Sequence, residues 1–218
     1  MSPRPSNPRR TIPPRPDAGP LAKVPFVGLT GGLGAGKSTA LQALRRLGAA
    51  TLSTDAVVHE LYASPELRDL VVARWGEDVA PDGVVDRAAI ATRAFASPAE
   101  RAWLEGEIWP RVGARIAAWR EEIAAQEPAP AAAVVETPLL FEAGMEAIYD
   151  ATVAVVADEG VRAERAAARG HVGIDERAAR QLPQEEKARR ATYTVSNSGT
   201  IEQLERELSG VLASLSRP

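Results

Sequence analysis

A lysine and two hydroxyl residues follow a run of closely spaced glycines near the start of this chain. Residues 31–39 read Gly-Gly-Leu-Gly-Ala-Gly-Lys-Ser-Thr, which fits the pattern Gly-x-x-x-x-Gly-Lys-Ser. Backbone N–H groups in such a loop point inward at an anion, and glycine is needed where oxygens approach the main chain too closely for a Cβ. The Lys37 ammonium would reach the terminal phosphates of a nucleotide, and the Ser38 hydroxyl would ligate Mg²⁺. The pattern therefore predicts a nucleoside triphosphate site.

The segments on both sides of the loop supply the elements that such a site requires. Residues 24–30 form an apolar run typical of a buried strand, and residues 40–47 have a helical pattern closed by Gly48. A strand, a glycine-rich turn and a helix N-terminus in this order add the helix dipole to the N–H groups of the loop. The nucleotide-binding residues predicted here are Gly32, Gly34, Ala35, Gly36, Lys37, Ser38 and Thr39.

Short apolar or β-branched runs predict strands at 24–30, 49–53, 131–136, 151–157 and 193–196. Helical patterns lie between most of them, which favours βαβ units and a parallel sheet. We therefore expect an α/β fold of three layers with a parallel five-stranded sheet. Ligands of open parallel sheets bind beyond the carboxyl ends of the strands, where residues 53–55, 136–142 and 196–199 would lie.

The remaining segments predict additions to this core. Residues 56–127 contain helical patterns at 56–62, 65–75, 86–94, from Pro98 onwards and at 108–126, and we interpret them as a helical insertion because they are too long for a loop. Residues 162–190 are rich in arginine and glutamate and predict a helical lid. Residues 1–23 contain seven of the 17 prolines and predict a disordered basic tail, with a nucleic-acid-binding arm as the alternative. The folded domain would span 24–216.

The composition excludes several classes of protein. The chain of 218 residues has no cysteine and two histidines, so it lacks disulfides and thiolate metal sites, and a histidine-built zinc site is improbable. No run approaches the roughly 18 apolar residues of a membrane span. The net charge of −3 disfavours an extended nucleic-acid surface. We expect a cytoplasmic protein, monomeric, without nucleic-acid or membrane partners.

Two carboxylates fall at predicted strand ends. Asp55 follows the second strand and precedes a helix, so it would either cap that helix or orient and deprotonate a hydroxyl that attacks a phosphate. Glu136 ends the third strand, where it would either hold Mg²⁺, directly or through water, or be a solvated strand end.

Later residues add cations and a turn. Arg165 and Arg169 are four positions apart on a predicted helix, so they would project from one face. They would either bind a triphosphate or simply be solvated. Asn197, Ser198 and Gly199 form a turn pattern, which would either be only a turn or let its backbone meet a nucleotide base.

From about 24 to 212 the chain resembles the dephospho-coenzyme A kinase family. The resemblance rests on residues 28–32 running into the loop, on Ser53-Thr54-Asp55, and on Pro-Leu-Leu-Phe-Glu at 138–142. It continues through residues 164–169 and 181–187 to Asn-Ser-Gly at 197–199. It implies a P-loop kinase that uses ATP and Mg²⁺ to phosphorylate the ribose 3′-hydroxyl of dephospho-CoA, which is the final step of CoA biosynthesis.

The resemblance also implies roles for single residues. Asp55 matches the proposed base or orienter, Arg165 and Arg169 match lid arginines near the phosphates, and Asn197 to Gly199 match a loop near the adenine. The insertion at 56–127 matches the CoA-binding subdomain. Ser53 departs from the family, since it replaces the first acid of an Asp-x-Asp motif, and Glu136 stands where aspartate is usual.

Two other functions would fit the residues. One is a different small-molecule kinase with the same phosphate loop. The other is a nucleotide-dependent regulator without kinase activity, although the chain has no Asn-Lys-x-Asp motif of the kind that GTP switches use to read the base.

Overall fold

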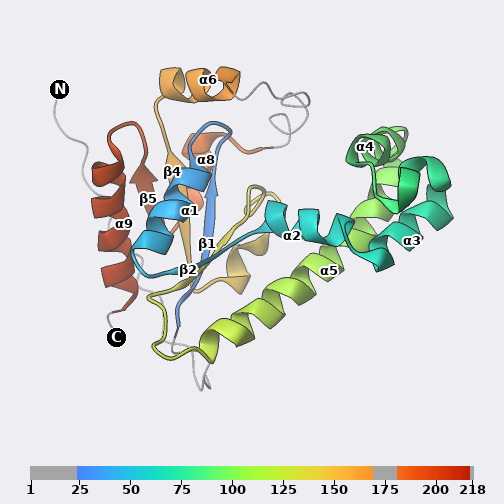
Figure 1. Ribbon diagram of the computed structural model, residues 1–218. Helices are drawn as coiled ribbons and strands as arrows, with labels where there is room; N and C mark the ends of the chain where they lie inside the picture. The colour runs from blue at the N-terminus through green and yellow to red at the C-terminus, as the bar shows by residue number, and fades with distance from the viewer. Residues whose placement is uncertain (1–23, 169–180, 217–218) are drawn as a thin grey trace. The chain divides into compact units, whose positions relative to one another are not determined.

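A computed structural model describes residues 24–168 and 181–216 of the chain (Figure 1). The chain divides into two compact units. Among the described residues, the sheet unit comprises 24–51, 122–168 and 181–216, and the helical unit is Leu52–Glu121. No helix in the described ranges is both long enough and apolar enough to cross a membrane.

The sheet unit is built on five strands in the order β2-β3-β1-β4-β5. The strands are β1 (Phe26–Gly31), β2 (Ala50–Ser53), β3 (Ala133–Glu136), β4 (Ala151–Val156) and β5 (Tyr193–Ser196). β1 pairs in parallel with β3 and β4, and β4 pairs in parallel with β5. The predicted parallel α/β sheet is confirmed, and its central strand is the one that leads into the glycine-rich loop.

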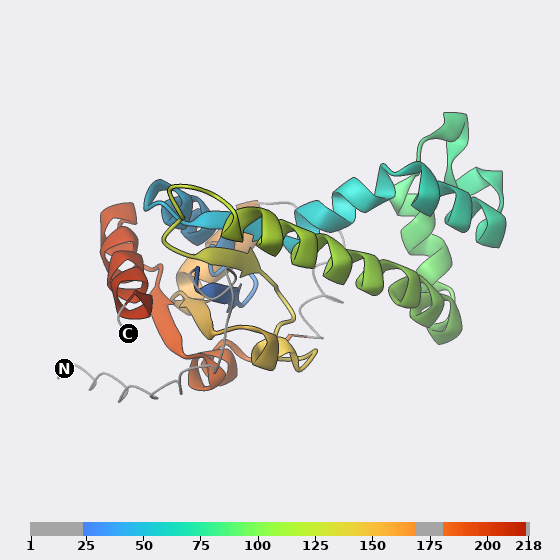
Figure 2. The same ribbon diagram turned by 90° about the horizontal axis from the view of Figure 1, so that it is seen from below.

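Helices cover both faces of this sheet, as Figure 2 shows from below. On one face α1 (Lys37–Arg46) packs against α9 (Ile201–Leu215), and their apolar sides form a buried core with β1, β3 and β4. Leu29, Leu204 and Leu208 in this core are fully buried. On the other face α8 (Gln184–Arg190) packs against β1 and β4. The α6 helix (Glu159–Ala168) follows β4.

The second face of the sheet requires a glycine in β1. A Cβ on Gly28 would lie 2.5 Å from Leu140 Cδ1 and 2.7 Å from the Tyr149 ring. Phe26 and Tyr149 stack there with ring centroids 4.9 Å apart. The absence of a side chain at Gly28 therefore lets the connection between β3 and β4 pack directly on the central strand.

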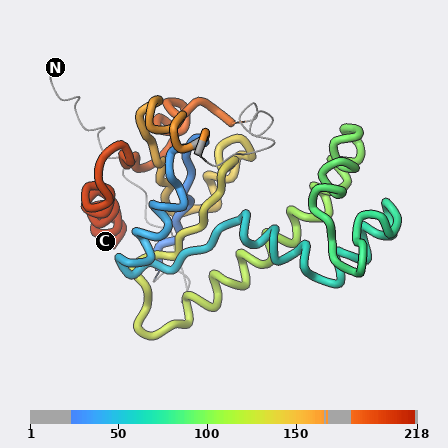
Figure 3. The backbone as a smooth tube through the Cα atoms, turned by 45° about the horizontal axis from the view of Figure 1, so that its top comes forward, coloured from blue at the N-terminus to red at the C-terminus, as the bar shows by residue number. Residues whose placement is uncertain are grey.

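The helical unit contains α2 (Thr54–Tyr62), α3 (Pro65–Trp75) and α4 (Arg87–Phe95), and α5 (Pro98–Ala124) begins in it; Figure 3 traces their order. Short 3₁₀ turns at Glu77–Val79 and Pro81–Gly83 connect α3 to α4. Local sequence explains the helix starts, because the Ser64 hydroxyl accepts from Leu67 N at 3.2 Å and Asp86 accepts from Ala88 N at 2.8 Å.

The expectation of two helices between Pro98 and residue 126 is wrong. α5 is one helix of 27 residues that continues through Pro110. A proline inside a helix removes a hydrogen bond and usually ends or kinks it. Here Leu104, Ile108, Val112 and Ile116 continue a buried apolar stripe past the proline. Burial of this stripe outweighs the local cost of the proline, which sequence pattern alone does not reveal.

Candidate active site

The glycine-rich loop has a backbone that other residues could not adopt easily. Gly34 and Gly36 have φ angles of +74° and +84°. A Cβ on Gly34 would lie 2.5 Å from the backbone oxygen of Arg162, and a Cβ on Gly36 would overlap the Asn197 side-chain amide. Both glycines are therefore required by conformation and by contact, because their positive φ angles and the neighbouring atoms of Arg162 and Asn197 leave no room for a side chain.

Lys37 is the first residue of α1, and its ammonium folds back over the loop. Nζ donates to the carbonyl of Gly31 at 3.1 Å and to that of Gly32 at 3.2 Å. The amide of Ala40 donates to Gly36 O at 3.0 Å, which begins the helix immediately after the loop. The loop thus combines a positively charged side chain with a helix N-terminus, a pair suited to bind an anion.

Asn197 joins the loop to the far end of the chain. Its side chain is 3% exposed, and Nδ2 donates to Ala35 O at 2.9 Å. Its own carbonyl accepts from Arg165 Nη1 at 3.0 Å. The structure therefore brings Asn197 and Arg165 to the glycine-rich loop. Arg169, the other predicted arginine, lies outside the described residues.

Gly199 lies between β5 and α9. A Cβ there would overlap the Gln203 side-chain oxygen, which accepts from Thr200 N at 2.8 Å in a capping box at the start of α9. Glycine at this position is required by the cap, and its predicted contact with a nucleotide base stays a prediction.

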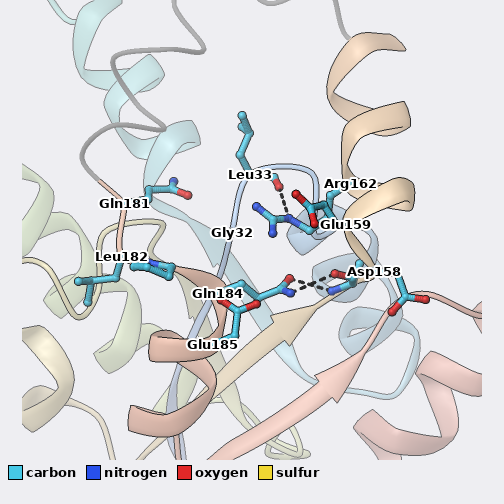
Figure 4. A pocket seen from close by; sticks show the side chains of 11 residues that line it. Gly32, Leu33, Asp158, Glu159, Arg162, Gln181, Leu182, Gln184 and Glu185 are labelled. Carbon is cyan, nitrogen blue, oxygen red and sulfur yellow. Dashed lines mark hydrogen bonds between the residues drawn. The ribbon is translucent and has the colours of Figure 1, made fainter.

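Arg162 was not among the residues predicted from the sequence, although it lies on α6 three positions before Arg165. Its Nε donates to the carbonyl of Leu33 at 3.0 Å. Figure 4 shows this bond at the edge of a cavity. The spacing of arginines at 162, 165 and 169 was a usable signal, because residues three and four apart share a helix face.

The cavity beside the loop has a volume of about 610 Å³. Gly32, Leu33 and Arg162 line one side, and the start of α8 lines the other. Gln184 fixes the α8 side, since its amide accepts from Ala157 N at 2.9 Å and donates to Ala157 O at 3.0 Å. The cavity is therefore a polar space, bordered by residues of the glycine-rich loop, by the start of α6 and by residues 181–185.

Glu136 and Ser38 are the two residues predicted to hold a metal, and that role stays a prediction. Glu136 ends β3 beside Leu29 of β1, and the next amide, Thr137 N, donates to Leu29 O at 2.8 Å. Glu136 is 9% exposed, so the alternative of a solvated strand end is wrong. Ser38 is an exposed residue in the first turn of α1. A hydroxyl and a carboxylate are oxygen donors of the kind that Mg²⁺ binds, since this ion binds few protein oxygens and takes the rest from phosphates and water.

No cluster of three or more His, Asp or Glu side chains within 24–168 and 181–216 could hold a metal by itself.

Asp55 belongs to the helical unit, in the first turn of α2. It does not occupy the capping position, which Ser53 holds without a side-chain cap bond. The capping alternative for Asp55 is therefore wrong. Its side chain is exposed, and its role toward a hydroxyl stays a prediction.

The chain also buries a lysine that sequence reasoning did not select. Lys187 of α8 has no exposed side-chain surface and pairs with Glu142 at 2.9 Å. Its Nζ also donates to the Pro138 carbonyl and lies 3.5 Å from Thr30 Oγ1. Burial lowers the pKa of Lys187, although Glu142 acts in the opposite direction. This lysine connects α8 to the end of β1 and to the turn after β3.

Comparison with known proteins shows the family of this chain. Residues 25–203 match the sequence profile of the family described as dephospho-CoA kinase. A dephospho-CoA kinase of Deinococcus radiodurans is 43% identical over 193 residues, which cover 87% of this chain and 91% of that protein. One from Anaeromyxobacter dehalogenans is 38% identical over 194 residues, with 87% and 91% covered.

Solved structures give the same result for the fold. The crystal structure of TT1252 from Thermus thermophilus is 35% identical, has a TM-score of 0.72, and is matched over 89% of this chain and 100% of that one. A dephospho-CoA kinase from Campylobacter jejuni, at 20% identity and a TM-score of 0.59 over 88% of this chain and 97% of that one, is similar in fold.

Proposed function

Because the chain belongs to the dephospho-CoA kinase family, we propose how its residues perform the reaction of that family. The reaction transfers the γ-phosphoryl group of ATP to the ribose 3′-hydroxyl of dephospho-CoA and yields CoA and ADP. The observation that supports the assignment most directly is the loop itself, in which Gly34 and Gly36 have positive φ angles, and Lys37 at the start of α1 donates to the carbonyls of Gly31 and Gly32. A second small-molecule substrate is not favoured by any feature of the site.

Lys37 would exchange its bonds to two carbonyls for bonds to the β- and γ-phosphates of ATP. Its ammonium already lies within hydrogen-bonding distance of the loop backbone, so a small change of rotamer would suffice. A charge held in the loop stabilises the negative charge that spreads over the transferred group.

Ser38 and Glu136 would hold the metal that accompanies ATP. When bound, Mg²⁺ neutralises charge on the β- and γ-phosphate oxygens. Glu136 is nearly buried at the end of β3, so its backbone is held by the sheet, and Ser38 is fixed by the first turn of α1. The two residues would thus supply oxygen ligands whose backbones are held by regular secondary structure.

Arg165 would act from α6, where Asn197 O holds one of its terminal nitrogens at 3.0 Å. Its guanidinium would donate to phosphate oxygens, and Arg169 would join it. Asn197 and Gly199 would line the place of the adenine, since Asn197 is fixed on the loop at Ala35.

Asp55 would hold the 3′-hydroxyl of dephospho-CoA for attack, and the helical unit would bind the rest of that substrate. Asp55 follows β2 directly along the chain, as the acid of such a kinase must follow a strand that ends at the ligand-binding edge. Its exposed carboxylate would accept the hydroxyl proton or orient the hydroxyl.

The experiment is to measure ADP formation from ATP and Mg²⁺ with and without dephospho-CoA, and to identify the product by its mass. Turnover that requires dephospho-CoA and yields CoA is the expected result. ATP hydrolysis that is unchanged by dephospho-CoA, with a different hydroxyl compound phosphorylated in a panel of acceptors, would overturn the proposal.

Variants would then separate the roles. Lys37→Ala should lower kcat by several orders of magnitude, whereas Glu136→Gln should mainly raise the Mg²⁺ concentration needed for half-maximal rate. Asp55→Asn keeps the size of the side chain but removes its charge. A near-normal kcat in Asp55→Asn would remove that residue from the role of base or orienter.

A further inference from the structure

We propose that Arg162 is an additional catalytic residue, which binds the transferred phosphoryl group from the cavity side of the glycine-rich loop. The inference rests on the proposed function, because it concerns the same phosphoryl transfer. The proposed role belongs to Arg162 and is separate from the roles predicted for Arg165 and Arg169. It is supported by the contacts of Arg162 with the glycine-rich loop.

The backbone of Arg162 is packed against the loop. A Cβ on Gly34 would lie 2.5 Å from Arg162 O and 3.0 Å from Arg162 Cα, so α6 and the loop touch through their main chains. The amide of Arg162 donates to Asp158 O at 3.0 Å, which fixes the first turn of α6. The Cα of Arg162 is therefore held at a definite place beside the loop, which a catalytic side chain requires.

The side chain is anchored at a second point. Its Nε donates to Leu33 O at 3.0 Å, and this bond sets the plane of the guanidinium. The guanidinium therefore lies beside Gly32, because Nη2 would be 3.2 Å and Cζ 3.4 Å from a Cβ placed on that residue. Figure 4 shows the guanidinium next to Gly32 and Leu33 at the cavity wall.

Two cations thus flank the same glycine. The Lys37 ammonium lies 3.2 Å from Gly32 O, and the Arg162 guanidinium lies over the Cα side of the same residue. Lys37 is the residue of the loop that reaches the γ-phosphate. An arginine held beside the same peptide can therefore reach the oxygens of that phosphate with its terminal nitrogens.

The chemistry of phosphoryl transfer gives this position its value. Charge spreads over the three equatorial oxygens of the transferred group, and an arginine that meets this charge contributes strongly to kcat. A guanidinium offers donors in a fixed planar fork, and the bond from Nε to Leu33 leaves that fork oriented before substrate arrives. An arginine oriented in advance stabilises the transition state more than the ground state, so its loss should lower kcat and not the affinity for ATP.

The test compares Arg162→Ala, Arg162→Lys and the exposed control Arg189→Ala. We expect kcat of Arg162→Ala to fall by about 100-fold or more, the scale for loss of one donor to the transition state, with KM for ATP within about threefold. Arg162→Lys should remain well below wild type, since an ammonium lacks the fork. Free guanidinium should restore part of the activity of Arg162→Ala. The Arg189→Ala variant, whose side chain is 76% exposed, should keep wild-type kcat.

A second measurement excludes a purely structural role. The affinity for ADP with aluminium fluoride, which resembles the transferred phosphoryl group, should weaken in Arg162→Ala, while the affinity for a non-hydrolysable ATP analogue and the unfolding temperature stay close to wild type. A kcat within threefold of wild type, or equal losses of affinity for both nucleotide complexes, would overturn the role of Arg162.

The two proposals fail in different ways. Absence of CoA formation by the wild-type enzyme would overturn the proposed function, and the aluminium fluoride measurement would still decide whether Arg162 contacts the phosphoryl position. Normal CoA formation by wild type and by Arg162→Ala would overturn only the role of Arg162.

Discussion

Replacement of Lys187 by methionine should destabilise the sheet unit strongly. The ammonium has no exposed surface, pairs with Glu142 at 2.9 Å and donates to the carbonyl of Pro138. Methionine fills a similar volume but leaves a carboxylate, 14% exposed, without its cation. Breaking a buried ion pair by removing one partner costs about 3–5 kcal/mol. In a chain of this size each kcal/mol lowers the unfolding temperature by roughly 2–4 °C, so the loss should be about 6–20 °C.

The unfolding signal must come from the sheet unit, where Lys187 lies. All four tryptophans lie in the helical unit, at positions 75, 103, 109 and 119, so their emission does not report on the sheet unit. Urea unfolding followed by circular dichroism gives the change in free energy. Hydrogen exchange of peptides covering β1 and β4 locates the loss, which should be concentrated there because Lys187 lies on the α8 face of those strands.

A double variant tests the cause. Burial lowers the pKa of Lys187 even beside Glu142, so charging this lysine has a net cost and the complete pair should contribute little. Lys187→Met combined with Glu142→Gln should therefore recover a large part of the lost stability, because the neutral amide can still accept from Leu182 N, now bonded at 2.7 Å. A loss below about 1 kcal/mol in Lys187→Met, or no recovery in the double variant, would refute the reasoning.

The wild-type protein has a related pH dependence. Because burial holds the folded-state pKa of Lys187 below its ordinary value of 10.5, the unfolded chain binds more protons between the two values. This group therefore makes stability rise with pH as pH approaches 10.5. The unfolding free energy of wild type minus that of Lys187→Met should therefore increase as pH is raised from neutral to alkaline values.

Three further predictions concern other parts of the chain. Hydrogen bonds first from Arg74 and then from Trp75 lower the pKa of Glu100 below 4.5. The stabilisation by the Glu100 carboxylate is therefore present above pH 4.5 and is lost as pH falls through the folded-state pKa. Acid unfolding followed by tryptophan emission should show a smaller loss of stability in Glu100→Gln than in wild type. Gly34→Ala should abolish nucleotide binding measured by calorimetry, because its Cβ meets backbone at 2.5 Å and φ is +74°; unchanged affinity would contradict the loop geometry. Thr200→Ala removes one side of a capping box and should cost about 1 kcal/mol in urea unfolding, whereas no loss would show that the α9 start needs no cap.

The sequence alone determined the elements whose signals are local. The glycine spacing, Lys37 and the apolar run before them specify the loop, because glycine conformations and helix starts depend on nearby residues. Each strand was predicted at nearly its observed position, since β-branched apolar runs between helical patterns have few other solutions.

Tertiary structure decided the features that depend on distant contacts. α5 continues through Pro110 because its buried stripe outweighs the local penalty. Lys187 lies in a charged segment, where the sequence alone suggests an exposed residue, yet it is fully buried. Its partner Glu142 is 45 residues earlier in the chain, and only the fold brings the two together. Arg162 is likewise positioned by the Leu33 carbonyl, which lies 129 residues earlier in the chain. Pairings of this kind are set by which strands are neighbours in the sheet, and no local pattern of residues encodes that order.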